Sequence, residues 1–327
     1  MNVFLKIEGL TVEYRSGNRH VHAVNDLDLQ LGEGEVLGFV GETGAGKTTT
    51  ALSILRILPN PPAKVLGGKV IFKDQDLFQL SDREMCAIRG EEIAMIFQDP
   101  MTSLDPVKTV GDQICEMILL HRNCSKKEAW EMAGDMLETV GIDRGRAGDY
   151  PHQFSGGMKQ RVVIAIALSC KPSLLIADEP TTALDVTIQA QILELMKELK
   201  KKYQSSMIMI THDLGIVAEI CDNVAIMYAG GVLEYGSVMD IYKDPRHPYT
   251  RALFDSIPDV HRDQARLKVI SGLPPDPTDI PSGCPFHPRC PHCTERCKTE
   301  KPEVVHLNET HWARCFLAQE EGRYEHE

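Results

Sequence analysis

The chain has 327 residues, of which 43% are hydrophobic and 25% charged, a composition typical of a globular protein with a main domain and an appended region. Its formal net charge of −12 argues against nucleic acid as a partner, because a negative surface repels phosphate backbones. The apolar runs are far shorter than the ~20 residues of a membrane-spanning helix, and no secretion signal is evident, so a cytoplasmic location is expected.

The first part of the chain predicts four strands followed by a helix. Alternating apolar and polar residues indicate half-buried strands separated by glycine-containing turns. The last strand is apolar throughout, as in a strand buried in a parallel sheet. The strands are expected over 5–7, 11–14, 24–29 and 36–40, and the helix over 48–58.

The turn after the apolar strand carries the phosphate-binding pattern G-x-x-x-x-G-K-[ST]. Its glycines let the backbone N–H groups point inward, and the start of the next helix adds positive potential. Lys47 is expected to neutralise phosphate charge, Thr48 to coordinate Mg²⁺ and Thr49 to add a phosphate contact. The alternative is a Gly-rich turn that binds nothing. The loop consists of Gly41, Glu42, Thr43, Gly44, Ala45, Gly46, Lys47 and Thr48.

The middle of the chain predicts a helical insertion within an α/β domain. The pattern is mainly helical from 89 to 169, and apolar strands then alternate with helices. Helices are expected over 128–140, 161–168 and 188–201, and strands over 174–178 and 207–210.

Two carboxylates end the apolar strand over 174–178. Strand polarity predicts that Asp178 and Glu179 lie at the carboxyl edge of the sheet, beside the phosphate loop. Asp178 fits an acceptor for Mg²⁺-bound water, and Glu179 fits the base that orients and polarises the attacking water. An acid pair after a strand can also be a plain loop start, but together with the phosphate loop it predicts nucleotide hydrolysis.

The string F-S-G-G-M-K-Q-R, which begins at Phe154, resembles the signature loop of ABC ATPases, usually written L-S-G-G-Q. A helix N-cap explains Ser155 but neither Gly156 nor Gly157. The resemblance implies that these three residues contact the γ-phosphate of ATP held by the opposite subunit. Phe154 and Met158 depart from the general signature and fit one of the two ATPase subunits of the peptide-importer branch.

Other elements of the same family follow in the expected order. Gln98 matches the glutamine that senses Mg²⁺ and links the catalytic core to the helical subdomain. Asp185, in an A-L-D string, matches the loop that crosses the dimer interface, and His212 matches the histidine that contacts γ-phosphate. Tyr14 is the candidate for the aromatic that stacks on adenine, with a core tyrosine as the alternative.

The resemblance implies an α/β fold, the ABC-type nucleotide-binding domain of P-loop NTPases. That domain has an antiparallel β subdomain, a RecA-like core and a helical subdomain, here expected over about 99–169. It is expected to span 1–240, and a Cys-rich C-terminal extension of the peptide-importer type to span 241–327. The many prolines of that extension predict an extended, irregular tail.

Two segments, Q-D-P-M-T-S-L-D-P from Gln98 and R-H-P-Y-T from Arg246, resemble the oligopeptide and dipeptide importer branch. This implies an ATPase subunit that drives peptide import by ATP-driven dimerisation, peripheral on the inner face of the cell membrane. The implied partners are a second, different ATPase, two membrane permease subunits and an extracytoplasmic peptide-binding protein. Nickel importers are close relatives, so nickel is the alternative substrate.

Five of the ten cysteines lie close to the C-terminal end. The quartet that omits Cys293 resembles the C-terminal pattern of peptide-importer ATPases, some of which carry a [4Fe–4S] cluster. A zinc site is the alternative, because Cys293 completes a C-x2-C pair and histidines lie nearby; absence of metal is a third reading. Any metal is expected to fix the tail. The quartet is Cys284, Cys290, Cys297 and Cys315, and the histidines are His287, His292 and His311.

ABC ATPases that do not transport are the rivals of a different class. A DNA-maintenance ATPase carries long heptad coiled coils, and no sustained heptads occur between Lys47 and Ser155. A ribosome-acting ABC protein ordinarily has two nucleotide domains, whereas this chain has one phosphate loop and one signature.

Overall fold

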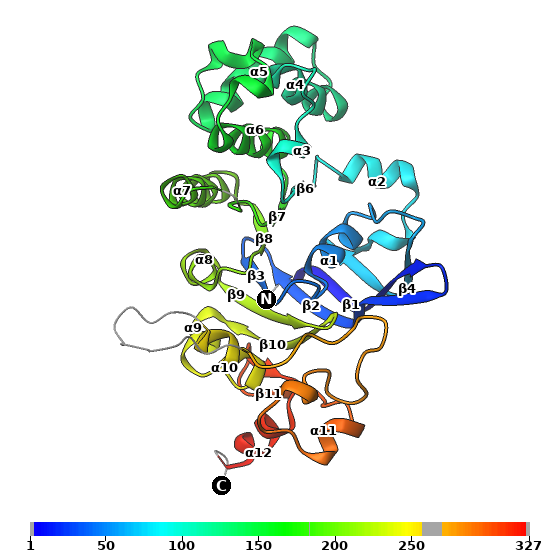
Figure 1. Ribbon diagram of the computed structural model, residues 1–327. Coiled ribbons are helices and arrows are strands. Elements are labelled where there is room, and N and C mark those ends of the chain that lie inside the picture. Colours follow the sequence, from blue (N-terminus) through cyan, green and yellow to red (C-terminus); the bar gives the residue numbers. More distant parts are fainter. Residues whose placement is uncertain (1–2, 183, 257–269, 325–327) are drawn as a thin grey trace. The chain divides into compact units, whose positions relative to one another are not determined.

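The computed structural model describes residues 3–182, 184–256 and 270–324, with side chains up to residue 320. The chain divides into two compact units (Figure 1). Unit 1 comprises Met1–Leu31, Leu37–Phe78 and Thr211–Glu327, and unit 2 comprises Gly32–Val36 and Gln79–Ile210. The boundary at residue 240 that the sequence suggests stays a prediction.

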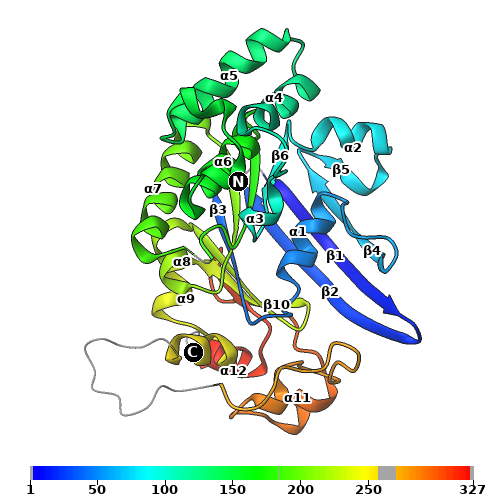
Figure 2. The same ribbon diagram turned by 45° about the horizontal axis from the view of Figure 1, so that its top comes forward.

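An antiparallel sheet, in the strand order β2-β1-β4-β5, forms the N-terminal part of unit 1 (Figure 2). The short strands expected over 5–7 and 11–14 are one continuous strand, because a register shift between Glu8 and Thr11 absorbs the irregularity. Gly68 is required on the facing strand, since a Cβ there would lie 2.5 Å from the Cα of Leu10. The strands are β1 (Val3–Ser16), β2 (Arg19–Gly32), β4 (Ala63–Phe72) and β5 (Gln75–Asp76).

The second sheet of unit 1 has the strand order β11-β12-β10-β9-β3. Strand β3 pairs with β9 in parallel, and the remaining pairs are antiparallel. The apolar segment expected as a buried strand is confirmed, since every residue of β3 is buried. The strands are β3 (Val36–Val40), β9 (Asn223–Tyr228), β10 (Gly231–Ser237), β11 (Val305–His306) and β12 (Trp312–Ala313).

The described parts of the C-terminal segment, residues 241–256 and 270–324, are more regular than their prolines predict. They contribute β11 and β12 to the sheet edge, and they contain several short helices (Figure 1). The expectation of an irregular tail is therefore wrong for these parts, because prolines stand within the first two positions of the helix Pro248–Asp255 and of the turn His287–Arg289, where proline favours a helix start. The helices of unit 1 are α1 (Lys47–Ile54), α8 (Leu214–Ile220), α9 (Val238–Lys243), α10 (Pro248–Asp255), α11 (Glu295–Thr299) and α12 (Phe316–Tyr324), with a 3₁₀ turn, η4, at His287–Arg289.

Unit 2 combines three parallel strands with helices. The strand order is β8-β7-β6, and both pairs are parallel. Helices α4, α5 and α6 lie together in Figure 1 and correspond to the helical subdomain expected over about 99–169. The strands are β6 (Ile93–Ile96), β7 (Leu174–Asp178) and β8 (Ser206–Ile210). The helices are α2 (Asp82–Ile88), α3 (Pro100–Ser103), α4 (Val110–His121), α5 (Lys126–Thr139), α6 (Gly156–Leu168) and α7 (Val186–Tyr203).

Two strands that precede predicted polar site residues are buried along their whole length. All five residues of β7 and all five of β8 are buried, so the strands hold the segments that follow them in fixed positions. Among the described helices, none has the length and apolar character that crossing a membrane requires.

Candidate nucleotide-binding site

The phosphate loop of unit 1 has a left-handed backbone, which favours glycine, at two positions. Gly44 has φ 82° and Gly46 has φ 99°, both in the left-handed region. A Cβ on Gly46 would lie 2.4 Å from the carbonyl oxygen of Ala23, which leaves no room for another residue. Helix α1 begins at the next residue, Lys47, so the loop presents its N–H groups at a helix start, as a phosphate site requires.

The lysine of this loop is buried within it. Lys47 is 8% exposed, and its Nζ donates to the carbonyl oxygens of Gly41 at 2.6 Å and Glu42 at 3.0 Å. Thr48 is exposed and Thr49 is half-buried. The predicted adenine-stacking residue lies close by, since the hydroxyls of Tyr14 and Thr49 are 3.4 Å apart. The stacking role itself stays a prediction.

A cavity of about 200 Å³ lies beside the loop. Residues of the loop from Glu42 to Ala45 line it, together with His22, Tyr228 and prolines of the C-terminal segment. The backbone N–H of His22 donates to the carbonyl oxygen of Pro277 at 2.8 Å, and this bond fixes the C-terminal segment beside the loop. Neither His22 nor Tyr228 was expected here from the sequence, because no local pattern links them to the loop.

In unit 2, the two predicted acids lie at the end of β7 as expected. Asp178 is 3% exposed, and the N–H of Glu179 donates to the carbonyl oxygen of Ile210 on the neighbouring strand at 2.8 Å. The Oε2 of Glu179 accepts hydrogen bonds from Gln98 at 3.1 Å and Thr182 at 2.8 Å. The structure thus brings Gln98 and Glu179 together, and it adds Thr182, which sequence reasoning missed.

The signature loop begins helix α6. Ser155 caps the helix, with its hydroxyl accepting from the N–H of Met158 at 3.4 Å. Packing explains Gly157, since a Cβ there would lie 2.6 Å from the Cγ2 of Ile188. Packing does not explain Gly156, where a Cβ would meet only Leu184 at 3.9 Å. The bare backbone at Gly156 is therefore consistent with close approach of a ligand.

The two departures from the general signature share one neighbour. The guanidinium of Arg146 lies 4.2 Å from the ring centre of Phe154, and its Nη1 lies 3.6 Å from the Sδ of Met158. A phenylalanine offers that cation an aromatic face, which a leucine would not. Phe154 and Met158 are thus matched to Arg146.

The remaining predicted residues occupy surface positions. Asp185 caps helix α7, with its carboxylate accepting from the N–H of Ile188 at 2.9 Å. Ala183 of the same A-L-D string lies outside the described residues. His212 is exposed in unit 1, immediately before the Asp213 cap of α8. The roles of Asp185 at a dimer interface and of His212 at γ-phosphate stay predictions.

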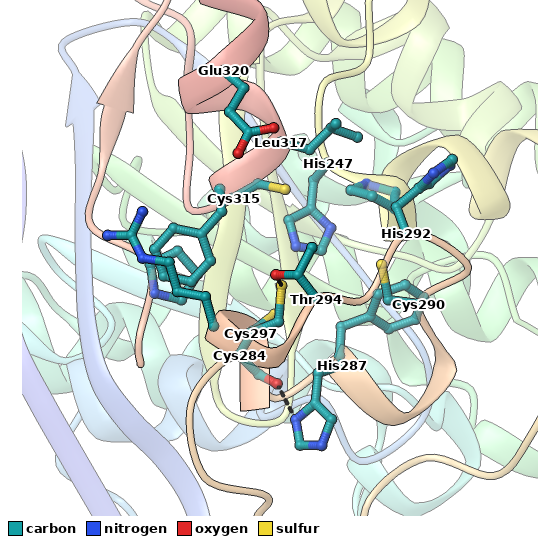
Figure 3. A pocket seen from close by; sticks show the side chains of 15 residues that line it. His247, Cys284, His287, Cys290, His292, Thr294, Cys297, Cys315, Leu317 and Glu320 are labelled. Atoms are coloured by element: carbon teal, nitrogen blue, oxygen red, sulfur yellow. Dashed lines mark hydrogen bonds between the residues drawn. The ribbon is translucent and has the colours of Figure 1, made fainter. Parts of the chain in front are cut away.

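The predicted cysteine quartet lines a single cavity of about 220 Å³ in unit 1 (Figure 3). Burial raises the pKa of Cys284 to about 12 and that of Cys290 to about 11. Cys293 is absent from the lining, whereas His287 and His292 belong to it. The cavity is lined by Cys284, Cys290, Cys297 and Cys315, with His247, Thr294, Arg296 and Glu320 among the polar neighbours.

This geometry supports neither the [4Fe–4S] cluster nor the zinc alternative. Within residues 3–182, 184–256 and 270–324, no three His, Cys, Asp or Glu side chains lie close enough to hold a metal ion. His311, expected as a candidate ligand, instead makes a buried 2.8 Å hydrogen bond to Glu234 on β10.

Two family models match the chain. Residues 24–182 match the family described as ABC transporter, and residues 233–297 match the C-terminal region of the oligopeptide/dipeptide transporter family. The oligopeptide transport ATP-binding protein AppD of Bacillus subtilis (strain 168) is 46% identical over 324 residues, 98% of this chain and 99% of that protein. The dipeptide transport ATP-binding protein DppD of the same organism is 49% identical over 328 residues, 100% of this chain and 97% of that protein.

A solved structure supports the fold. The dimeric, post-hydrolysis ATP-binding cassette MJ0796, bound to ADP and Pi, is 27% identical with a TM-score of 0.65. The similarity covers 72% of this chain and 98% of that one. The fold expected from the signature and phosphate loops is therefore confirmed.

Proposed function

Because the chain belongs to the ATP-binding proteins of oligopeptide and dipeptide ABC transporters, we propose that it hydrolyses ATP to power peptide import. The observation that carries the proposal is the combination in one chain of a phosphate loop with Lys47 folded into it and a catalytic-type acid, Glu179, held by two hydrogen bonds. The near full-length similarity to peptide transport proteins favours peptides over nickel as the cargo.

The proposed chemistry divides between two sets of side chains. Lys47 and the loop N–H groups bind the β- and γ-phosphates, and Tyr14 stacks on the adenine. Glu179 accepts the proton of the attacking water, while Gln98 and Thr182 hold its carboxylate in place. His212 contacts the γ-phosphate.

Mg²⁺ fits the oxygen donors that these residues offer. The Thr48 hydroxyl, the Gln98 amide oxygen and the buried Asp178 carboxylate are hard ligands of the kind that Mg²⁺ prefers. When bound, the ion neutralises charge on the phosphate oxygens.

The transport cycle requires partners. In our proposal ATP joins this chain to a second, different ATPase, whose signature loop closes over the nucleotide, while Ser155, Gly156 and Gly157 of this chain close over the partner's nucleotide. Asp185 lies at that interface. ATP binding therefore favours the closed pair, because it adds contacts that only the closed state makes. Two membrane permeases anchor the pair at the inner face of the cell membrane, and a peptide-binding protein delivers the cargo outside.

We further propose that the cysteine quartet holds a [4Fe–4S] cluster. Four thiols that line one cavity supply the all-cysteine donor set that such a cluster uses, and they would have to move closer together to bind it. When bound, the cluster would tie the loop around Cys284 and Cys290 to Cys297 of α11 and to Cys315, next to α12. Iron and sulfide analysis of anaerobically purified protein, with absorbance near 400 nm, tests this; a colourless protein free of both contradicts it.

Uptake into proteoliposomes that contain the whole transporter tests the cargo. We expect ATP-dependent accumulation of a radiolabelled dipeptide or oligopeptide library and none of ⁶³Ni²⁺. The Lys47→Ala variant of this chain should abolish uptake. Nickel uptake without peptide uptake would contradict the proposal.

A further inference from the structure

The guanidinium of Arg289, on the 3₁₀ turn η4 of the C-terminal segment, is fully engaged with the phosphate loop and its surroundings. Two of its nitrogens form a bidentate pair with the Glu42 carboxylate, at 2.6 and 3.0 Å. The remaining donors reach the Tyr228 hydroxyl and the carbonyl oxygens of Ser271 and Ile270, at 3.2, 3.1 and 3.4 Å. These are five acceptors for the five N–H donors of an arginine, a set that a lysine cannot match.

The same loop residue is held a second time by the C-terminal segment. The N–H of Glu42 donates to the hydroxyl of Tyr249 on helix α10 at 3.0 Å. Tyr249 is fully buried against Tyr228 and Phe286, with ring centres 4.6 and 5.2 Å away. Glu42 is thereby fixed through both its backbone and its side chain.

Fixing Glu42 also fixes the lysine of the loop. The Nζ of Lys47 donates to the carbonyl oxygens of Gly41 and Glu42, so the position of the ammonium depends on the position of those carbonyls. A chain of direct contacts therefore runs from Arg289 through Glu42 to Lys47, entirely within unit 1.

The pair also has an electrostatic consequence. Glu42 places a carboxylate within the loop that binds phosphates, where an unpaired negative charge would repel the ligand. The side chain of Arg289 is 4% exposed and that of Glu42 is 26% exposed, so water screens this charge only in part. Arg289 cancels it.

We propose that Arg289 is a positioning residue of the nucleotide site: it holds and neutralises Glu42 so that the loop and Lys47 are ready for the phosphates. The inference rests on the proposed role of residues 41–48 as the ATP-binding loop. It makes the C-terminal segment a functional part of the ATP site.

A double-mutant cycle on the full-length chain tests the proposal, with the affinity for AMP-PNP·Mg²⁺ measured by calorimetry. Arg289→Gln leaves the half-buried Glu42 carboxylate without its cation beside the phosphates and should weaken binding ~10-fold. Glu42→Gln removes the repelling charge and should change affinity less than ~3-fold. The double variant should bind more tightly than Arg289→Gln alone, because the unpaired charge is gone.

Whether the double variant binds AMP-PNP·Mg²⁺ more tightly or more weakly than Arg289→Gln distinguishes a positioning role from simple destabilisation. A purely structural role predicts that the second substitution leaves affinity unchanged or weakens it further. Arg289→Gln with wild-type affinity, or a double variant no better than the single, would overturn the proposal. If Arg289→Gln fails to fold, Arg289→Lys provides the second route: it keeps the charge but not the five donors, and wild-type affinity in that variant would also overturn the positioning role.

Matched controls come from an exposed pair in the same segment. Lys298 and Glu295 form a 2.6 Å ion pair with side chains 48% and 88% exposed. Lys298→Gln and Glu295→Gln should leave affinity unchanged, singly and together.

Lys47→Ala separates the two proposals: if wild-type chain binds the analogue and Lys47→Ala does not, the loop assignment stands whatever Arg289→Gln shows.

Discussion

Glu179 illustrates how far the chemistry of single residues follows from the sequence. The strand pattern over 174–178 and the two acids after it were enough to predict the position of this carboxylate. The residue adopts φ 46°, in a left-handed conformation that is uncommon for glutamate and that costs on the order of 1 kcal/mol. Neither this conformation nor the Thr182 contact could be predicted, because both depend on the turn that follows the strand.

Thr182→Val tests the contact that the sequence did not reveal. It removes the 2.8 Å hydrogen bond to the Oε2 of Glu179 with little change in volume. We expect turnover to fall ~3–10-fold with unchanged affinity for nucleotide, since one hydrogen bond contributes ~0.5–1.5 kcal/mol. Steady-state hydrolysis by the assembled transporter and a nucleotide titration measure the two quantities.

The control is Thr139→Val, whose hydroxyl donates to the carbonyl oxygen of Asp135 at 2.9 Å on the surface of α5. Equal loss of turnover in both variants would mean that Thr182 has no special role.

The two glycines of the signature should respond differently to alanine. The Cβ of Gly156→Ala makes only an ordinary contact with Leu184, at 3.9 Å, and should leave the free energy of unfolding within about 0.5 kcal/mol, but it should lower turnover of the assembled transporter if a nucleotide approaches that backbone. Gly157→Ala forces Ile188 to move and should destabilise the chain by ~1–3 kcal/mol. Urea unfolding and ATP hydrolysis separate the two effects. Full turnover in a folded Gly156→Ala variant would argue against the signature role.

At the scale of elements, long apolar strands and capped helices were predictable, and strands that depend on distant partners were not. Strand β3 and helix α7 follow from local patterns, whereas β4, β9 and β10 were missed because their pairing sets their conformation. The proline-rich C-terminal segment was misjudged for the same reason. Its strands exist because β12 pairs with β10, where Trp312 stacks on Tyr235 at 5.8 Å.

The junction of β10, α10 and β12 predicts a pH dependence of stability. His247 is 1% exposed, and burial lowers its pKa to about 4; its Nδ1 accepts from the N–H of Tyr249 at 3.0 Å, as a neutral ring can. An unfolded histidine titrates near pH ~6.5, so between these values the unfolded chain binds more protons than the folded chain. Stability is complete above pH ~6.5 and falls by up to ~1.4 kcal/mol per unit as the pH decreases.

Urea unfolding followed by Trp312 fluorescence in a Trp130→Phe background reports on this part of the chain at pH 7.5, 6.5 and 5.5. His247→Gln should flatten the dependence over this range. An unchanged slope would show that other groups cause it. Glu234, whose pKa is held below its usual value against the effect of burial, chiefly by its hydrogen bond from His311, contributes with the same sign only below pH ~4.5 and so leaves the slope in this range to His247.

At the scale of the whole molecule, sequence motifs predicted an ABC-type ATPase. The structure adds how the C-terminal segment contacts the phosphate loop. Arg289 and Tyr249 lie more than two hundred residues from Glu42 in the chain, so no local pattern could reveal the contact. Membership of the family accounts for ATP hydrolysis, and the proposed partner subunits account for its coupling to transport.

Peptide-stimulated ATP hydrolysis by the reconstituted transporter tests the central claim, that this chain hydrolyses ATP through Glu179. With Glu179→Gln in this chain alone, we expect hydrolysis at its site to fall at least ~100-fold while AMP-PNP still binds, because the base is lost and the phosphate loop is intact. Glu116→Gln, an exposed acid of α4, is the control. Wild-type hydrolysis in the Glu179→Gln transporter would contradict the account.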